Sequence, residues 1–142
     1  MITFDVNVLV QAFREDSPRH EEIRRSLETH IYSDNSFALS DLVLSGFLRI
    51  VTHPRIFDPP TPLAPALEFA EAVRSQPNCV TLSPGRGHWK IFRQLCEEAD
   101  ARGNLIPDAF HAALAIESGC EWISTDRDFS RFTGLRWNTP FA

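Results

Sequence analysis

Four aspartates stand where expected strands end or an expected helix begins, far apart along the chain. They are Asp5 after residues 2–4, Asp108 after Ile106-Pro107, and Asp126 with Asp128 after residues 121–124. The binding crevice of an open α/β sheet lies outside the carboxyl ends of its strands, so we expect these side chains to meet there. Gathered carboxylates repel one another unless a cation neutralises them, and hard oxygen ligands suit Mg²⁺ or Mn²⁺. The pattern therefore predicts a divalent-metal site.

Each acid also has a purely structural interpretation. Asp5 and Asp128 could begin turns, and Asp108 could be an acid in a first helical turn, where the helix dipole stabilises it by about 0.3–1 kcal/mol. Two polar neighbours favour a site: Asn7 could bond to Asp5 or to a metal-bound water, and Thr125 adds a hydroxyl at the same crevice.

The helix expected after Pro107 is rich in alanine, which would let it approach the sheet closely and bring Asp108 to the strand ends. His111 lies one turn further and could supply a nitrogen ligand. An ordinary helix residue is the favoured interpretation for His111, because oxygen-rich sites suit hard cations.

The elements that must position these residues alternate along the chain. Strands are expected at residues 2–4, 36–39, 79–82 and 121–124, with a short fifth at 134–137. Helices are expected over residues 6–14, 17–30, 40–51, 65–74, 88–102 and 107–118. Strands separated by helices predict an α/β fold with a mainly parallel four- or five-stranded sheet and helices on both faces.

Composition narrows the class of protein. A chain of 142 residues, 43% of them hydrophobic, suits one domain over residues 1–142. Its net charge of −5 gives no general support for nucleic-acid binding. No apolar run approaches the roughly 20 residues of a membrane helix, and no signal peptide is expected. Three cysteines without metal-ligand spacing indicate reduced thiols and a cytoplasmic protein.

These motifs, in this order, resemble those of the PIN-domain ribonucleases, and among them the VapC-type toxins of bacterial toxin–antitoxin pairs. The resemblance covers essentially the whole chain. It is carried by the residues at 4–9 (FDVNVL), 39–49 (LSDLVLSGFLR), 107–115 (PDAFHAALA), 124–129 (STDRDF) and 134–137 (GLRW). It implies a three-layer α/β/α fold and metal-dependent endonucleolytic cleavage of RNA.

The resemblance also implies roles for individual residues. By matching motifs, the catalytic acids would be Asp5, Asp108, Asp126 and Asp128, of which the first three would hold Mg²⁺ or Mn²⁺. Asn7 and Thr125 would support them. The partners implied are an RNA substrate, a cognate antitoxin protein and a second copy of the chain in a homodimer, with no membrane.

The chain departs from the family pattern at Gly46, where the family usually carries a Glu. Asp41 could substitute, but it lies five residues earlier, about 140° away around a helix, and beside the expected cap Ser40. A capping role is favoured for Asp41. The alternative function is therefore a catalytically weakened or inactive PIN-like module that binds RNA or protein. Restoring a glutamate at residue 46 is the discriminating test.

Other residues could hold substrate phosphates. A Gly-rich turn over residues 83–87 enters a helix and could offer backbone amides together with Arg86 and His88, while Arg49 is a further candidate. A plain turn with a helix cap is the simpler interpretation of the Gly-rich segment. A receiver-type or haloacid-dehalogenase-type phosphoryl-transfer domain is disfavoured, because Lys90 lies in a helix rather than after a late strand.

Overall fold

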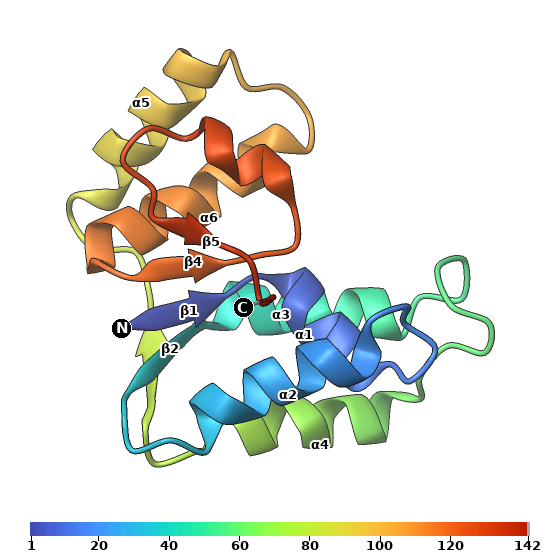
Figure 1. The fold of residues 1–142 in the computed structure, drawn as a ribbon. Coiled ribbons are helices and arrows are strands. Elements are labelled where there is room, and N and C mark those ends of the chain that lie inside the picture. The colour runs from blue at the N-terminus through green and yellow to red at the C-terminus, as the bar shows by residue number, and fades with distance from the viewer. Residues whose placement is uncertain (142) are drawn as a thin grey trace.

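A parallel sheet runs through the centre of the molecule, whose computed structural model describes residues 1–141 (Figure 1). Within these residues the strands are β1 (Ile2–Phe4), β2 (Phe37–Ser40), β3 (Cys79–Leu82), β4 (Glu121–Ile123) and β5 (Trp137–Asn138). Their spatial order is β3-β2-β1-β4-β5, and every neighbouring pair is parallel. The expected sheet is confirmed, with its fifth strand at residues 137–138 rather than 134–137.

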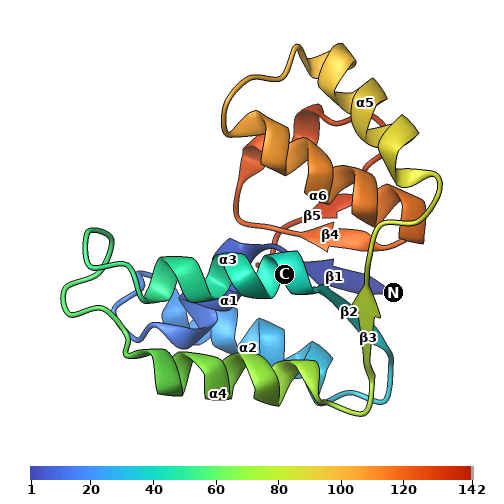
Figure 2. The same ribbon diagram turned by 180° about the vertical axis from the view of Figure 1, so that it is seen from behind.

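Helices cover both faces of the sheet. They are α1 (Val6–Phe13), α2 (His20–Ile31), α3 (Asp41–Val51), α4 (Leu63–Arg74), α5 (His88–Ala99) and α6 (Leu105–Ser118), with the 3₁₀ turn η1 (Arg127–Arg131) after β4. The connections from β1 to β2 and from β2 to β3 move the same way across the sheet, so right-handed crossovers place α1–α4 on one face. The connection from β3 to β4 crosses the sheet in the other direction, which places α5 and α6 on the opposite face (Figures 1 and 2). The three-layer α/β/α architecture is confirmed.

Two helix boundaries differ by three residues from those expected, and the others by two residues or fewer. The second helix begins at His20 rather than Ser17, because residues 17–19 form a turn in which the His20 N–H donates to the Ser17 carbonyl over 3.1 Å. The fifth helix ends at Ala99, three residues early. Asp100 takes a left-handed backbone conformation (φ 47°), and the Ala101 N–H then donates to the Cys96 carbonyl over 2.9 Å, which closes the helix.

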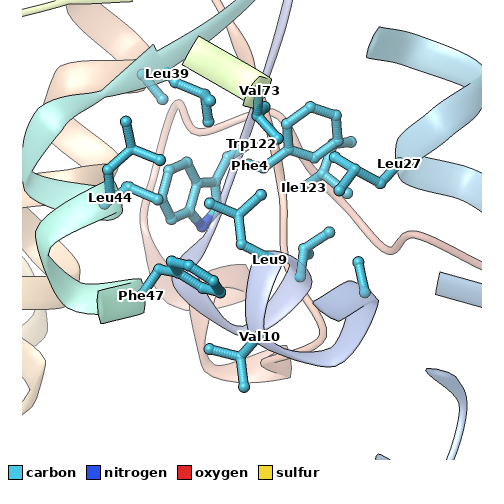
Figure 3. Close-up of a cluster of buried hydrophobic side chains, with 14 of the residues drawn as sticks. Phe4, Leu9, Val10, Leu27, Leu39, Leu44, Phe47, Val73, Trp122 and Ile123 are labelled. Carbon is cyan, nitrogen blue, oxygen red and sulfur yellow. The ribbon is translucent and has the colours of Figure 1, made fainter. Parts of the chain in front are cut away.

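The core joins the strands to the helices that carry the site. Figure 3 shows apolar side chains from β1, α1, α3 and β4 converging, among them Phe4, Leu9, Phe47 and Trp122, all nearly inaccessible to solvent. The strand order reverses at β1, because β2 and β3 lie on one side of it and β4 and β5 lie on the other. A ligand crevice is expected at such a switch point. No helix among the described residues is long and apolar enough to cross a membrane.

Candidate active site

Asp5 lies at the carboxyl end of β1 and is 8% exposed. One carboxylate oxygen accepts the Val6 N–H over 2.7 Å, so Asp5 caps α1. The other oxygen accepts from the Ser124 hydroxyl over 2.6 Å and from the Asn7 amide over 3.1 Å. The backbone N–H of Asp5 also donates to the Ile123 carbonyl over 2.9 Å. Asp5 is therefore held in one orientation at the switch point.

Ser124 connects Asp5, at the end of β1, with Asp126, which follows β4. Its hydroxyl donates to Asp5 and accepts from the Asn7 amide over 3.1 Å and from the Asp126 backbone N–H over 3.0 Å. The Asn7 side-chain oxygen accepts the Thr125 N–H over 3.2 Å, and the Thr125 hydroxyl accepts from Gln11 over 3.3 Å. The expected supporting contact between Asn7 and Asp5 is present. These contacts of Ser124 were not predicted from the sequence, although a serine directly before Thr125-Asp126 is a readable signal.

Asp126 and Asp128 follow β4. The Asp126 carboxylate accepts the Asp128 N–H over 2.9 Å and caps η1. Asp128 is 64% exposed and lies 3.5 Å from the guanidinium of Arg131. Asp126 is thus fixed by its own turn, whereas Asp128 occupies the outer rim.

Asp108 lies in the first turn of α6, half-buried. Its pKa is raised from the usual value of 3.8 to about 6, mainly by burial and also by the negative charges of Asp5, Asp126 and Asp128, against an opposing effect of Arg131. Coulomb repulsion decays with distance, so these contributions indicate that Asp5, Asp126 and Asp128 lie within reach of the Asp108 charge. That Asp5, Asp108 and Asp126 together bind one cation stays a prediction.

The negative charge at the site is only partly balanced by the protein, because Arg131 offsets just part of the effect of the other acids on Asp108. The pKa of Asp5 is also raised from 3.8 to about 6, mainly by burial and with a contribution from Asp126, against the hydrogen bonds from Ser124 and Val6. Because burial and mutual repulsion disfavour the ionised forms of Asp5 and Asp108, a cation that binds between them stabilises the site.

An open cleft of about 440 Å³ leads to these acids. Its walls include Asp5 and Asp108 from the acid cluster, Gly46 and Arg49 from α3, and His111 from α6. The donor set of carboxylate oxygens and the unbalanced charge fit a hard divalent cation. Among residues 1–141 no group of three or more carboxylate, imidazole or thiol side chains stands close enough together to hold a metal ion. Mg²⁺ keeps several of its waters, so water would complete its coordination.

Gly46 has a packing reason to lack a side chain. A Cβ atom at this position would lie 2.9 Å from Cγ2 of Val6, where α3 crosses α1. Val6 is β-branched and has little freedom to rotate within a helix. The missing glutamate therefore coincides with close helix contact. The substitution Gly46→Glu alone is a poor test of activity, because it would also disturb the two helices.

Asp41 does not join the other acids. Its two oxygens accept from Nε and Nη2 of Arg74 over 2.8 and 3.2 Å, and this ion pair holds the pKa of Asp41 below its usual range. Ser40, not Asp41, caps α3 by accepting the Leu42 N–H over 3.1 Å. The prediction of Asp41 as a substitute acid does not fit this position; the ion pair joins α3 to α4.

The Gly-rich turn over residues 83–87 is already occupied by an anion from the same chain. The Gly85 and Gly87 N–H groups donate to the two carboxylate oxygens of Glu117 over 2.8 and 2.9 Å. Glu117 lies nine residues beyond Asp108 on α6, roughly 13 Å along the helix axis. This contact favours the simpler interpretation of the segment, a plain turn, over the alternative in which its amides hold RNA phosphate.

The three basic residues considered for RNA binding lie in different parts of the fold. His88 is 4% exposed, its Nε2 lies 3.0 Å from the Phe110 carbonyl oxygen, and its ring packs against Phe110 and Phe92. His88 is therefore part of the interior and does not suit RNA contact. Arg86 is exposed on the distant turn. Of the three basic candidates, only Arg49 lines the cleft.

Comparisons with known proteins agree with this architecture. The model of the PIN domain family matches residues 2–135. Ribonuclease VapC25 of Mycobacterium tuberculosis is 45% identical over 140 residues, which cover 99% of this chain and 99% of that protein. VapC ribonuclease Mb2897 of Mycobacterium bovis is 44% identical over 140 residues, covering 99% and 95%.

Solved structures with low sequence identity share the fold. The crystal structure of M. tuberculosis VapC20, a sarcin–ricin loop cleaving toxin, superposes with a TM-score of 0.70 at 16% identity over 95% of this chain and 98% of that one. VapBC2 from Rickettsia felis, bound to a DNA fragment from its promoter, gives a TM-score of 0.71 at 19% identity over 98% of each chain.

Proposed function

The chain belongs to the PIN-domain family, and from that premise we propose that it is a metal-dependent endoribonuclease, the toxin of a toxin–antitoxin pair. The observation that carries the proposal is the pair Asp5 and Asp108, which face one cleft with pKa values of about 6. Relatives 44–45% identical over their whole length are named ribonucleases. An inactive binding module is not favoured, because Gly46 has an explanation in helix packing.

The cation would be Mg²⁺ or Mn²⁺, held by Asp5, Asp108 and Asp126 with waters. When bound, such an ion stabilises negative charge on a phosphodiester and makes water more acidic. Ser124 and Asn7 hold the Asp5 carboxylate in place at the cleft by donating to its Oδ2 atom.

The remaining polar groups act on the substrate or at the rim. The Arg49 guanidinium lines the same cleft and is placed to bind a phosphate of the RNA. Asp128, at the exposed rim, is a further acid that can orient water.

The proposal extends to partners and place. The neighbours include toxin–antitoxin complexes, such as one from Klebsiella pneumoniae with a TM-score of 0.66, which supports an antitoxin as the regulatory partner. We also propose that residues 1–142 form one domain that works as a homodimer. A cytoplasmic location is supported by the three free cysteines, Cys79, Cys96 and Cys120.

The function is tested by incubating the purified protein with total RNA and Mn²⁺ and mapping new 5′ ends. The wild type and the matched control Asp41→Asn should give the same set of ends, because Asp41 pairs with Arg74 away from the cleft. Asp108→Asn and wild type in EDTA should give none. Ends that persist in EDTA or in Asp108→Asn contradict the proposal.

A further inference from the structure

His111 is a polar side chain for which the metal site gives no explanation. It lies on α6 one turn beyond Asp108, is 8% exposed, and lines the same cleft as Asp5 and Asp108. Its ring stacks on the indole of Trp122, with ring centres 5.5 Å apart and planes at 17°. Within the described residues its Nδ1 atom is buried and has no hydrogen-bond partner.

The protonation state of His111 follows from this burial. Burial lowers its pKa to about 4, so the ring is neutral at physiological pH. A buried N–H without a partner is rarer than a buried acceptor without one. We therefore assign the nitrogen that carries no proton to the buried Nδ1. The single ring proton then sits on Nε2, which is the nitrogen that can be reached from the cleft.

Packing alone does not explain a histidine at this position. A phenylalanine would stack on Trp122 equally well and would remove the unpaired Nδ1, leaving the Trp122 Nε1 as the remaining buried nitrogen without a partner among the described residues. A lysine or arginine at residue 111 would be drawn into an ion pair with the acids. A neutral ring keeps its N–H available for another acceptor that enters the cleft.

We propose that His111 is a substrate-binding residue whose Nε2–H donates a hydrogen bond to a phosphate oxygen of the RNA backbone. This inference rests on the proposed ribonuclease function. Arg49 and His111 then contact the sugar–phosphate chain from α3 and α6, on walls of the cleft that the acids leave free. The arrangement supplies substrate contacts without placing a second positive charge among the acids.

Two variants separate binding from packing. His111→Phe keeps an aromatic ring on Trp122 and removes the donor, whereas His111→Gln keeps a side-chain N–H of similar reach. The probe is a fluorescein-labelled single-stranded RNA oligonucleotide that spans one cleavage site mapped in total RNA with the wild type. Cleavage of the probe gives kcat and KM, and fluorescence anisotropy in Ca²⁺ gives the Kd.

The donor role predicts a specific set of results. His111→Phe should raise KM and Kd about 10-fold or more, the usual effect of losing a hydrogen bond to a charged group, with kcat changed by about twofold or less. Its unfolding temperature should equal or exceed that of the wild type, and its Mn²⁺ affinity should be unchanged. His111→Gln should recover most of the lost affinity.

Other results overturn the inference. Wild-type KM and Kd in His111→Phe would mean that the ring only packs on Trp122. A loss of Mn²⁺ affinity in both variants would make His111 a metal ligand instead. These failures differ from failure of the proposed function, in which the wild-type protein itself cleaves no RNA and this inference falls with it.

Discussion

Replacing Asp108 by Asn should stabilise the protein when no metal is present. The folded state raises the pKa of Asp108 from 3.8 to about 6, so its ionised form is disfavoured by about 3 kcal/mol at neutral pH. The side chain keeps part of its surface in water, which screens the charges and roughly halves this value. The substitution also loses the favourable interaction of the carboxylate with the helix dipole, which subtracts about 0.3–1 kcal/mol from the gain in stability. We therefore expect a net gain of about 1 kcal/mol.

The assay is thermal unfolding in EDTA and then in saturating Mn²⁺. For a chain of this length, about 1 kcal/mol corresponds to a rise of about 3 °C in Tm for Asp108→Asn in EDTA. In Mn²⁺ the order should reverse, because a ligand that binds only the folded wild type stabilises it by mass action. Glu68→Gln makes the same chemical change on the exposed face of α4 and should shift Tm by about 1 °C or less in both conditions.

The pH dependence gives a second measure of the same charge. Between about pH 4 and pH 6 the folded Asp108 binds more protons than the unfolded one, so its contribution to stability falls as pH rises through this window. In EDTA, the free energy of unfolding of the wild type minus that of Asp108→Asn should therefore decrease from pH 4 to pH 6 and then level off. A flat difference, or a variant less stable than the wild type in EDTA at neutral pH, refutes the reasoning.

Three further predictions concern residues around the site. Gly46→Ala should lower the free energy of unfolding in urea by about 1–3 kcal/mol, because its Cβ would press against Val6. Adding Val6→Ala to this variant should relieve much of that loss, and purely additive effects of the two changes would contradict the close contact. Ser124→Ala should cost about 1–3 kcal/mol and lower nuclease activity by releasing Asp5, with unchanged RNA cleavage counting against this role. Glu117→Ala should lower Tm by freeing two amides while leaving kcat unchanged; a large loss of activity would mean that the turn at residues 83–87 acts on RNA after all.

The sequence predicts the site where local signals are strong. A β-branched and aromatic triplet before Asp5, the Ser40 cap and Gly119 mark the ends of strands and helices, and each of these signals can be read in a short segment. Alternating strands and helices then bring the strand ends to one edge of a parallel sheet. The shared position of Asp5 and Asp108 at one cleft could therefore be inferred without coordinates.

The rest depends on contacts between segments remote in sequence. The clash that a Cβ at Gly46 would make with Val6 exists only because α3 crosses α1, and no window of residues around Gly46 contains it. Likewise, the amides of the turn at residues 83–87 appear free until Glu117 is known to lie against them. Such contacts depend on how the helices and strands pack against one another. Patterns in a short stretch of sequence do not reveal that packing.

The position of β1 between β2 and β4 has a consequence during protein synthesis. Ser124, whose hydroxyl orients Asp5, follows it by 119 residues, so the ribosome makes Asp5 long before the partners that hold it. A nascent chain that stops short of β4 cannot yet fix the Asp5 carboxylate at the cleft, and the metal site that we propose forms only after β4 has been added to the sheet.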